Sequence, residues 1–245
     1  MKKKKIFLSI LFFYILIIIL VEYTFNPLIS TLSNNYGKIV NHGPKEEKVI
    51  ALTFDDGPHP IYTDEILDVL KEYDVKATFF VLGKFAELYP DIIKRQSREG
   101  HEIGNHTYSH VDPKKVSKEK LLDEYERTQN IVTNLTNKEP KLFRPPYGSF
   151  NSNTLDVMEM NDTIIVLWSA YQDSKDWSNP KVEKIINTTL SNVKNGDIIL
   201  FHDYVYYDKS NTIEALKKIL PELKNRGYNF LTISELIDLE TKSNE

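Results

Sequence analysis

The sequence of 245 residues contains no cysteine, which excludes both disulfide bonds and thiolate ligands for a metal ion. It has no internal repeat, and its one low-complexity tract is the group of lysines at residues 2–5. It also lacks an excess of positive charge, since the formal net charge is −4 and becomes more negative without those lysines. An acidic body argues against a nucleic-acid partner, because proteins bind nucleic acids mainly by neutralising phosphates.

The composition is that of a globular protein, with 41% hydrophobic and 27% charged residues. The chain is long enough for one large domain with a substantial core.

One long apolar run, residues 6–21, follows the lysines. As a helix it would span about 24 Å, slightly less than the hydrocarbon core of a bilayer. The flanking lysines and Tyr23 can reach the membrane interfaces and make up the difference. We expect lysines and a membrane anchor in residues 1–25 and a polar spacer in residues 26–47. The alternative is a signal peptide cleaved to release a secreted protein, but no small-residue cleavage site follows the run. Both interpretations place the remaining chain outside the cytoplasm, facing the cell wall.

From residue 49 onward, strand-like and helix-like segments alternate. Helical spacing of apolar residues is clearest in residues 117–137 and 211–226. The alternation predicts parallel βαβ units in a domain of residues 48–240, with a tail at 241–245. Periodicity alone leaves open a doubly wound sheet or a barrel of the TIM type. The seven expected strands are residues 49–55, 77–83, 101–106, 142–144, 163–169, 197–202 and 229–232.

Polar residues gather at the carboxyl ends of these predicted strands. Asp55 and Asp56 end the first strand, His106 the third, Arg144 the fourth and His202 the sixth. In both candidate architectures, functional sites form where parallel strands end. We therefore expect these side chains to line one pocket.

The adjacent acids and the paired histidines suggest a metal site with a separate base. Neighbouring carboxylates on an extended backbone point to opposite sides, so Asp55 and Asp56 are expected to have different roles. His106 and His110 are four residues apart and can converge with one acid on an ion. Two imidazoles and a carboxylate suit catalytic zinc, and also non-haem iron, although nothing else in the sequence indicates oxygen chemistry.

Two further motifs suggest catalytic roles. The prolines after Arg144 make a rigid loop, in which Arg144 can orient a carboxylate and a backbone N–H can face a developing oxyanion. His202 next to a carboxylate from another loop would stay protonated near neutral pH, as a general acid must.

Five motifs in this order resemble those of the carbohydrate esterase family 4 polysaccharide deacetylases, the NodB homology domain. The resemblance covers about residues 49–239 and implies a distorted (β/α) barrel with about seven parallel strands, which favours the barrel over the open sheet. The motifs lie at residues 53–58, 106–110, 144–148, 173–177 and 200–203.

The resemblance also implies a role for each site residue. The catalytic residues would be the base Asp55, the acid His202, and their partners Arg144 and Asp176. The metal ligands would be Asp56, His106 and His110. Around the substrate, Tyr147 would offer its backbone N–H to the oxyanion, and a pocket for the acetyl methyl group would be formed by Trp177 and Leu200.

The implied activity is metal-dependent hydrolysis of N-acetyl groups from N-acetylglucosamine in a cell-wall polysaccharide, with release of acetate. The expected ion is Zn2+, with Co2+ or another divalent ion as alternatives. The short tether of the expected anchor favours peptidoglycan as the substrate. Chito-oligosaccharide, exopolysaccharide and N-acetylmuramic acid are alternative substrates, and a glycan-binding wall protein without activity is an alternative function.

Overall fold

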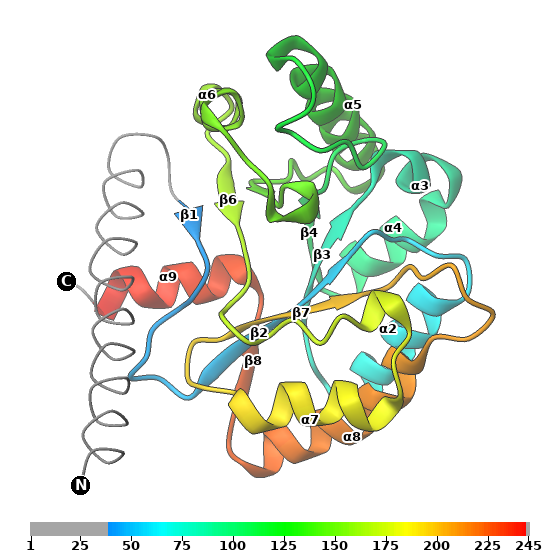
Figure 1. The fold of residues 1–245 in the computed structure, drawn as a ribbon, viewed down its shortest axis with the longest axis vertical. Coiled ribbons are helices and arrows are strands. Elements are labelled where there is room, and N and C mark those ends of the chain that lie inside the picture. The colour runs from blue at the N-terminus through cyan, green and yellow to red at the C-terminus, as the bar shows by residue number, and fades with distance from the viewer. Residues whose placement is uncertain (1–38, 244–245) are drawn as a thin grey trace, which may run out of the picture. The chain divides into compact units, whose positions relative to one another are not determined.

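A curved sheet of parallel strands organises the computed structural model, which describes residues 39–243 (Figure 1). The expected anchor, residues 1–25, lies outside the described residues, as does most of the expected spacer. None of the helices found within residues 39–243 combines the length and the apolar character that crossing a bilayer requires.

In this part of the chain the sheet has eight strands, and every pairing between them is parallel. Their order is β1-β6-β5-β4-β3-β2-β7, and β8 pairs with the first half of β2. The strands are β1 (Ile39–Val40), β2 (Val49–Asp55), β3 (Thr78–Val81), β4 (Glu102–Asn105), β5 (Leu142–Phe143), β6 (Ile164–Val166), β7 (Ile198–His202) and β8 (Asn229–Leu231).

Helices follow most of the strands and cover the sheet (Figure 1). The two longest are α5, which Ser117 caps by accepting from the Lys120 N–H, and α8. The α-helices are α2 (Tyr62–Glu72), α3 (Gly83–Leu88), α4 (Pro90–Arg98), α5 (Lys118–Thr136), α6 (Ser152–Met160), α7 (Val182–Asn192), α8 (Asn211–Asn225) and α9 (Ile233–Ser243), and the 3-10 turns are η1 (Pro146–Gly148) and η2 (Asp176–Ser178).

All seven residues of β2 are buried, as expected for a central parallel strand covered on both faces. Its alternate side chains enter different parts of the core. Ile50, Leu52 and Phe54 pack in the larger cluster, which includes apolar residues of α2 and α8. Val49 and Ala51 pack in a smaller cluster with residues of β6, β7 and α9. Because side chains alternate along a strand, Asp55 lies on the same face of the sheet as Val49 and Ala51.

The two edges of the sheet are joined by segments outside the regular strands. The Ser169 N–H donates to the Ile198 carbonyl, and the Leu200 N–H donates to the Gln172 carbonyl, both at 3.0 Å. Asp173 and Leu200 also form an isolated parallel bridge. The segment that follows β6 therefore closes the sheet irregularly onto β7, which makes it a distorted barrel.

The seven expected strands are all present, most of them shorter by one to three residues at an end. The additional strand, β1, lies within residues 26–47, where a polar spacer was expected, and pairs with β6 through Ile39 and Val40. Two apolar residues are too few for a recognisable strand pattern, so only the tertiary pairing reveals β1.

Gly104 in β4 allows Phe80 of β3 to pack against the neighbouring strand. A Cβ atom at this position would lie 2.5 Å from the Phe80 ring and 3.3 Å from the Leu142 carbonyl oxygen. We expect Gly104→Ala to lower the free energy of unfolding by about 1–3 kcal/mol through overpacking, as measured by denaturant titration.

The matched test repeats Gly104→Ala in a Phe80→Leu background. Because the smaller side chain leaves room for the new methyl group, the cost of Gly104→Ala should fall in that background. An equal cost in both backgrounds would contradict the steric explanation.

Candidate active site

Asp55 ends β2 and forms a buried ion pair with Arg144, which follows β5. Arg144 is fully buried and donates from Nη1 to Asp55 Oδ1 at 2.8 Å and to Thr53 Oγ1 at 2.7 Å. Its Nε and Nη2 donate to the carbonyls of Val166 and Leu167, each at 3.2 Å. Burial lowers the pKa of Arg144, and the Asp55 carboxylate acts in the opposite direction. The hydrogen bonds of the guanidinium group fix the geometry of the pair.

Asp56 has a left-handed backbone, with φ of 75°, and this bend turns its side chain away from the Arg144 pair. The next residue, Gly57, donates its N–H to the buried Asp203 carboxylate at 3.0 Å. A Cβ atom on Gly57 would lie 2.1 Å from Asp203 Oδ2, so this position requires glycine. Burial raises the pKa of Asp203 to about 7, while hydrogen bonds from Thr63 and Gly57 act in the opposite direction.

The loop that carries the two histidines, residues 106–110, is held by buried polar side chains. Asn105 accepts from the Thr107 N–H at 2.9 Å, and Glu124 of α5 accepts from the Ser109 N–H at 2.7 Å. His106 Nδ1 lies 2.6 Å from the Arg144 carbonyl oxygen, so this nitrogen donates and Nε2 keeps its lone pair.

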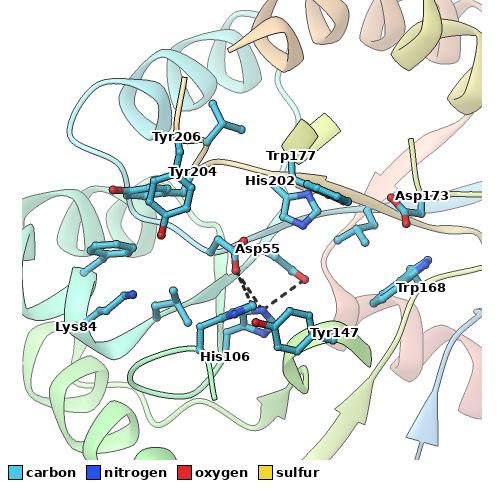
Figure 2. Close-up of a pocket in the computed structure, with 16 residues that line it drawn as sticks. Asp55, Lys84, His106, Tyr147, Trp168, Asp173, Trp177, His202, Tyr204 and Tyr206 are labelled. Carbon is cyan, nitrogen blue, oxygen red and sulfur yellow. Dashed lines mark ion pairs between the residues drawn. The ribbon is translucent and has the colours of Figure 1, made fainter. Parts of the chain in front are cut away.

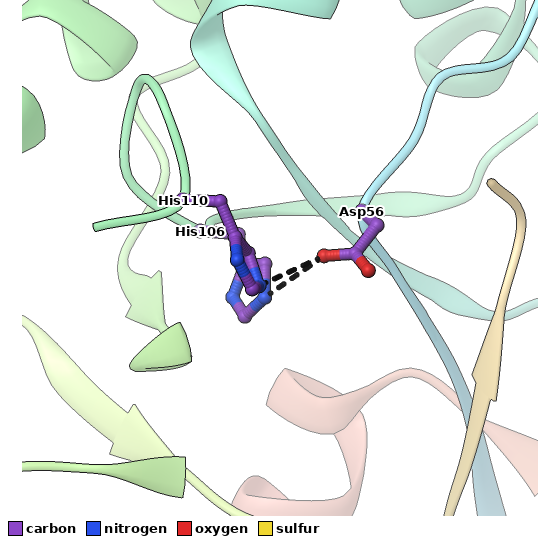
Figure 3. A group of neighbouring side chains, drawn as sticks. All are labelled: Asp56, His106 and His110. Carbon is purple, nitrogen blue, oxygen red and sulfur yellow. Dashed lines mark ion pairs between the residues drawn. The ribbon is translucent and has the colours of Figure 1, made fainter. Parts of the chain in front are cut away.

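These constraints bring the three expected metal ligands together (Figure 3). Asp56 Oδ1 lies 3.4 Å from His106 Nε2 and 3.2 Å from His110 Nε2. The ligand atoms of a tetrahedral zinc site, each about 2.1 Å from the ion, stand roughly 3.4 Å apart. Asp56 Oδ1 is also buried without a hydrogen-bond partner among the described residues, as expected for an oxygen whose lone pairs are free to bind a cation. The three side chains therefore fit a divalent metal ion.

The electrostatics of Asp56 agree with that fit. Burial raises the pKa of the Asp56 carboxyl group, but contacts with His106 and His110 outweigh burial and hold the pKa well below its usual range. The carboxylate is therefore ionised, as a metal ligand must be.

His202 ends β7 and contacts Asp176 of η2 twice. Its Nδ1 lies 2.8 Å from Asp176 Oδ1, and its backbone N–H donates to Asp176 Oδ2 at 2.9 Å. Thr212 of α8 also donates to Asp176 Oδ2, at 2.8 Å. Burial alone lowers the pKa of His202, but Asp176, aided by Asp56 and Asp55, raises it to about 9. The imidazole is therefore protonated at neutral pH.

The two neighbouring acids, Asp55 and Asp56, line one open cavity of about 560 Å³ together with His106, His110 and His202 (Figure 2). Tyr147, in a left-handed conformation in η1, is 68% exposed and sets its ring edge against His110 with centroids 4.7 Å apart. Trp177 is half exposed at the rim, and Leu200 is buried in the wall.

All ten predicted site residues thus belong to one site, eight lining the cavity and two, Arg144 and Asp176, lying behind it. Sequence reasoning missed Trp168, which lines the cavity just after β6 and lies 5.9 Å from the Arg144 guanidinium. The expected strand 163–169 placed Trp168 inside a strand, whereas β6 ends at Val166, so the search for polar strand ends did not select it. The sequence did not establish a role for Tyr204 and Tyr206, which also line the cavity.

Comparison with known proteins gives the same family as the motifs. Residues 42–163 match the polysaccharide deacetylase family. A peptidoglycan-N-acetylglucosamine deacetylase of Bacillus cereus is 46% identical over 194 residues, covering 79% of this chain and 90% of that protein. The peptidoglycan-N-acetylmuramic acid deacetylase PdaC of Bacillus subtilis is 37% identical over 203 residues, covering 80% of this chain and 42% of that longer protein.

Among solved structures, the Bc1960 peptidoglycan N-acetylglucosamine deacetylase superposes with a TM-score of 0.81 at 38% identity. The match covers 86% of this chain and 97% of that one. Fold, motifs and overall similarity therefore agree: the chain belongs to the polysaccharide deacetylase family, carbohydrate esterase family 4, and is an amide hydrolase that acts on N-acetyl groups.

Proposed function

We propose that this protein hydrolyses the acetamide of N-acetylglucosamine in peptidoglycan, with a divalent metal ion held by Asp56, His106 and His110. The observation that carries the proposal is the convergence of these ligands in one cavity that also contains Asp55 and His202. The choice of peptidoglycan is supported by the similar proteins, several of which are named for N-acetylglucosamine in that polymer.

Two imidazole nitrogens and a carboxylate oxygen favour Zn2+, with Co2+ as an alternative, over ions that prefer oxygen ligands alone. When bound, such an ion would polarise the acetamide carbonyl and lower the pKa of a water molecule.

Asp55 is placed to take the proton from the attacking water. Its Oδ1 is held by Arg144, while its Oδ2 lies 3.9 Å from His106 Nε2, on the side of the metal ligands. Arg144 keeps the carboxylate from rotating away and from binding the metal in place of Asp56. The division between the two acids therefore follows from their different partners.

His202 is placed to protonate the departing amine. Because Asp176 occupies Nδ1, the other ring nitrogen, Nε2, carries the proton that is transferred. The Tyr147 N–H would donate to the oxyanion, and Trp177 and Leu200 would enclose the acetyl methyl group. The C–N bond breaks, acetate takes the hydroxyl group of water, and glucosamine leaves with the proton from His202.

The proposal includes a location outside the cytoplasm, at the membrane. It rests on the lysines and the apolar run at residues 2–21. Such an anchor would hold the catalytic domain close to its polymeric substrate.

Acetate release tests the activity directly. The metal-loaded protein should release acetate from peptidoglycan and from N-acetylated chito-oligosaccharide. Activity should be lost with a chelator and restored by Zn2+, as followed by an enzymatic acetate assay. Glycan binding without acetate from any acetylated glycan, with metal present, would instead favour a binding protein.

The two neighbouring acids should respond differently to substitution. Asp55→Asn should lower kcat by roughly 10²- to 10⁴-fold, as loss of a general base does, while the protein keeps its metal. Asp56→Ala should lose both metal and activity. Metal content by elemental analysis and acetate release together check this, and metal loss in Asp55→Asn would show that the two roles are reversed.

The pH dependence of kcat/KM should report the protonation of His202. A general acid with a raised pKa is protonated below that pKa, so kcat/KM should fall as the pH rises through about 9. Asp176→Asn removes the charge that raises this pKa but leaves His202 buried, so the falling limb should move down by roughly one to three pH units. Asp238→Asn in α9 serves as a control. A falling limb that stays in place in Asp176→Asn would argue against His202 as the acid.

A further inference from the structure

One side of the active-site cavity carries groups that the proposed reaction does not use. Lys84, Phe85, Tyr204 and Tyr206 line it, beyond the metal ligands and the catalytic pair. In Figure 2, Lys84 and Tyr204 lie to one side of Asp55, and Trp168 and Asp173 lie to the other. The cavity therefore extends past the reacting acetamide in two directions, as a site for a glycan chain would.

The aromatic rings on this side support one another in a fixed arrangement. Tyr204 stacks on Phe85 with centroids 4.4 Å apart and planes 7° from parallel. His59 and Tyr206 each pack edge to face with Tyr204, at 5.0 and 5.1 Å. Tyr206 is 84% exposed. Rigid aromatic groups of this kind provide contact area at low entropic cost, which suits the apolar face of a sugar.

Lys84 is positioned by the loop that carries the metal ligands. It is the second residue of α3, and its N–H donates to the Tyr108 carbonyl at 3.0 Å. The Gly83 N–H donates to the Thr107 carbonyl, also at 3.0 Å. The start of α3 is thus joined to residues 106–110. The Lys84 ammonium group lies over the Phe85 ring, 4.6 Å from its centroid.

The Lys84 ammonium group has no acidic partner among residues 39–243. Glu87, on the same helix, is instead bonded to Tyr108 and Arg127. A cation in the first turn of a helix also faces the positive end of the helix dipole, so Lys84 does not stabilise α3. The positive charge of Lys84 is therefore available to bind a ligand.

The charges around the cavity are unevenly distributed. Of the described lysines and arginines, Lys84 alone lines it. The acid Asp173 lies on the opposite side, near Trp168 (Figure 2). An anionic group on a bound glycan would therefore be attracted to the Lys84 side and disfavoured on the Asp173 side.

We propose that Lys84 binds a carboxylate on the sugar next to the one that is deacetylated, and so favours acidic glycans over neutral ones. The inference rests on the proposed function and names a specificity residue for it. In a peptide-free peptidoglycan strand, every second sugar carries a free lactyl ether carboxylate, so both neighbours of an internal N-acetylglucosamine are acidic. One of them always reaches the Lys84 side, whereas a chitin oligosaccharide has no such group.

Binding measurements separate this charge effect from catalysis. The full chain carrying Asp55→Asn, with and without Lys84→Met, is titrated calorimetrically with two glycans. One is the peptide-free tetrasaccharide of alternating N-acetylglucosamine and N-acetylmuramic acid, and the other is chitotetraose. Lys84→Met should weaken binding of the acidic glycan about fivefold more than binding of chitotetraose, as expected for one half-exposed charged contact. Added salt should reduce the same preference.

Lys71→Met in α2, at an exposed position outside the cavity, is the matched control and should leave the ratio of the two dissociation constants unchanged. Equal weakening for both glycans in Lys84→Met, or no weakening, would overturn the proposal. Acetate release by proteins with Asp55 intact is measured separately. Its absence would count against the proposed hydrolysis, whereas an unchanged ratio of dissociation constants would count against Lys84.

Discussion

The buried ion pair between Arg144 and Asp55 connects the parts of the barrel that build the active site. The Arg144 side chain holds Asp55 and Thr53 of β2 and the carbonyls that end β6, while its own carbonyl accepts from His106. A buried charge that loses its partner costs about 3–5 kcal/mol, so both groups stay fixed together. The positions of Asp55 and of the His106 imidazole therefore depend on the same residue.

Around that pair, the backbone adopts conformations that an unsupported chain would avoid. Asp56, Thr107, His110 and Tyr147 all have positive φ, which costs a non-glycine residue on the order of 1–3 kcal/mol. Buried polar side chains offset this cost: Asn105 and Glu124 hold the histidine loop, and Asp203 holds the turn after Asp56, which only glycine at position 57 allows. Asp56, His106 and His110 converge because these buried hydrogen bonds hold the two loops that carry them.

The two sides of the cavity differ in charge. The residues at its centre, in contrast, belong to the motifs that the chain shares with its family. Lys84 comes from α3, which is hydrogen-bonded to the loop of residues 106–110, and Asp173 comes from the segment that closes the barrel against β7. The loop that carries His106 and His110 therefore also fixes the start of α3, and with it the position of Lys84.

The sequence by itself determined the seven main strands and the family, because apolar strands that end in Asp, His or Arg form a local pattern. It also selected ten residues that the structure places together in one site. It did not reveal β1, whose two residues carry too little pattern, nor Trp168, nor Lys84, which looks like any surface lysine. The family resemblance implied that Arg144 pairs with Asp55 and that Asp56 joins the histidines, but only the tertiary structure shows the contacts that divide the two acids in this way. That division depends on contacts between residues nearly 90 positions apart and on a backbone bend at Asp56, and neither is encoded by the spacing of residues along the chain.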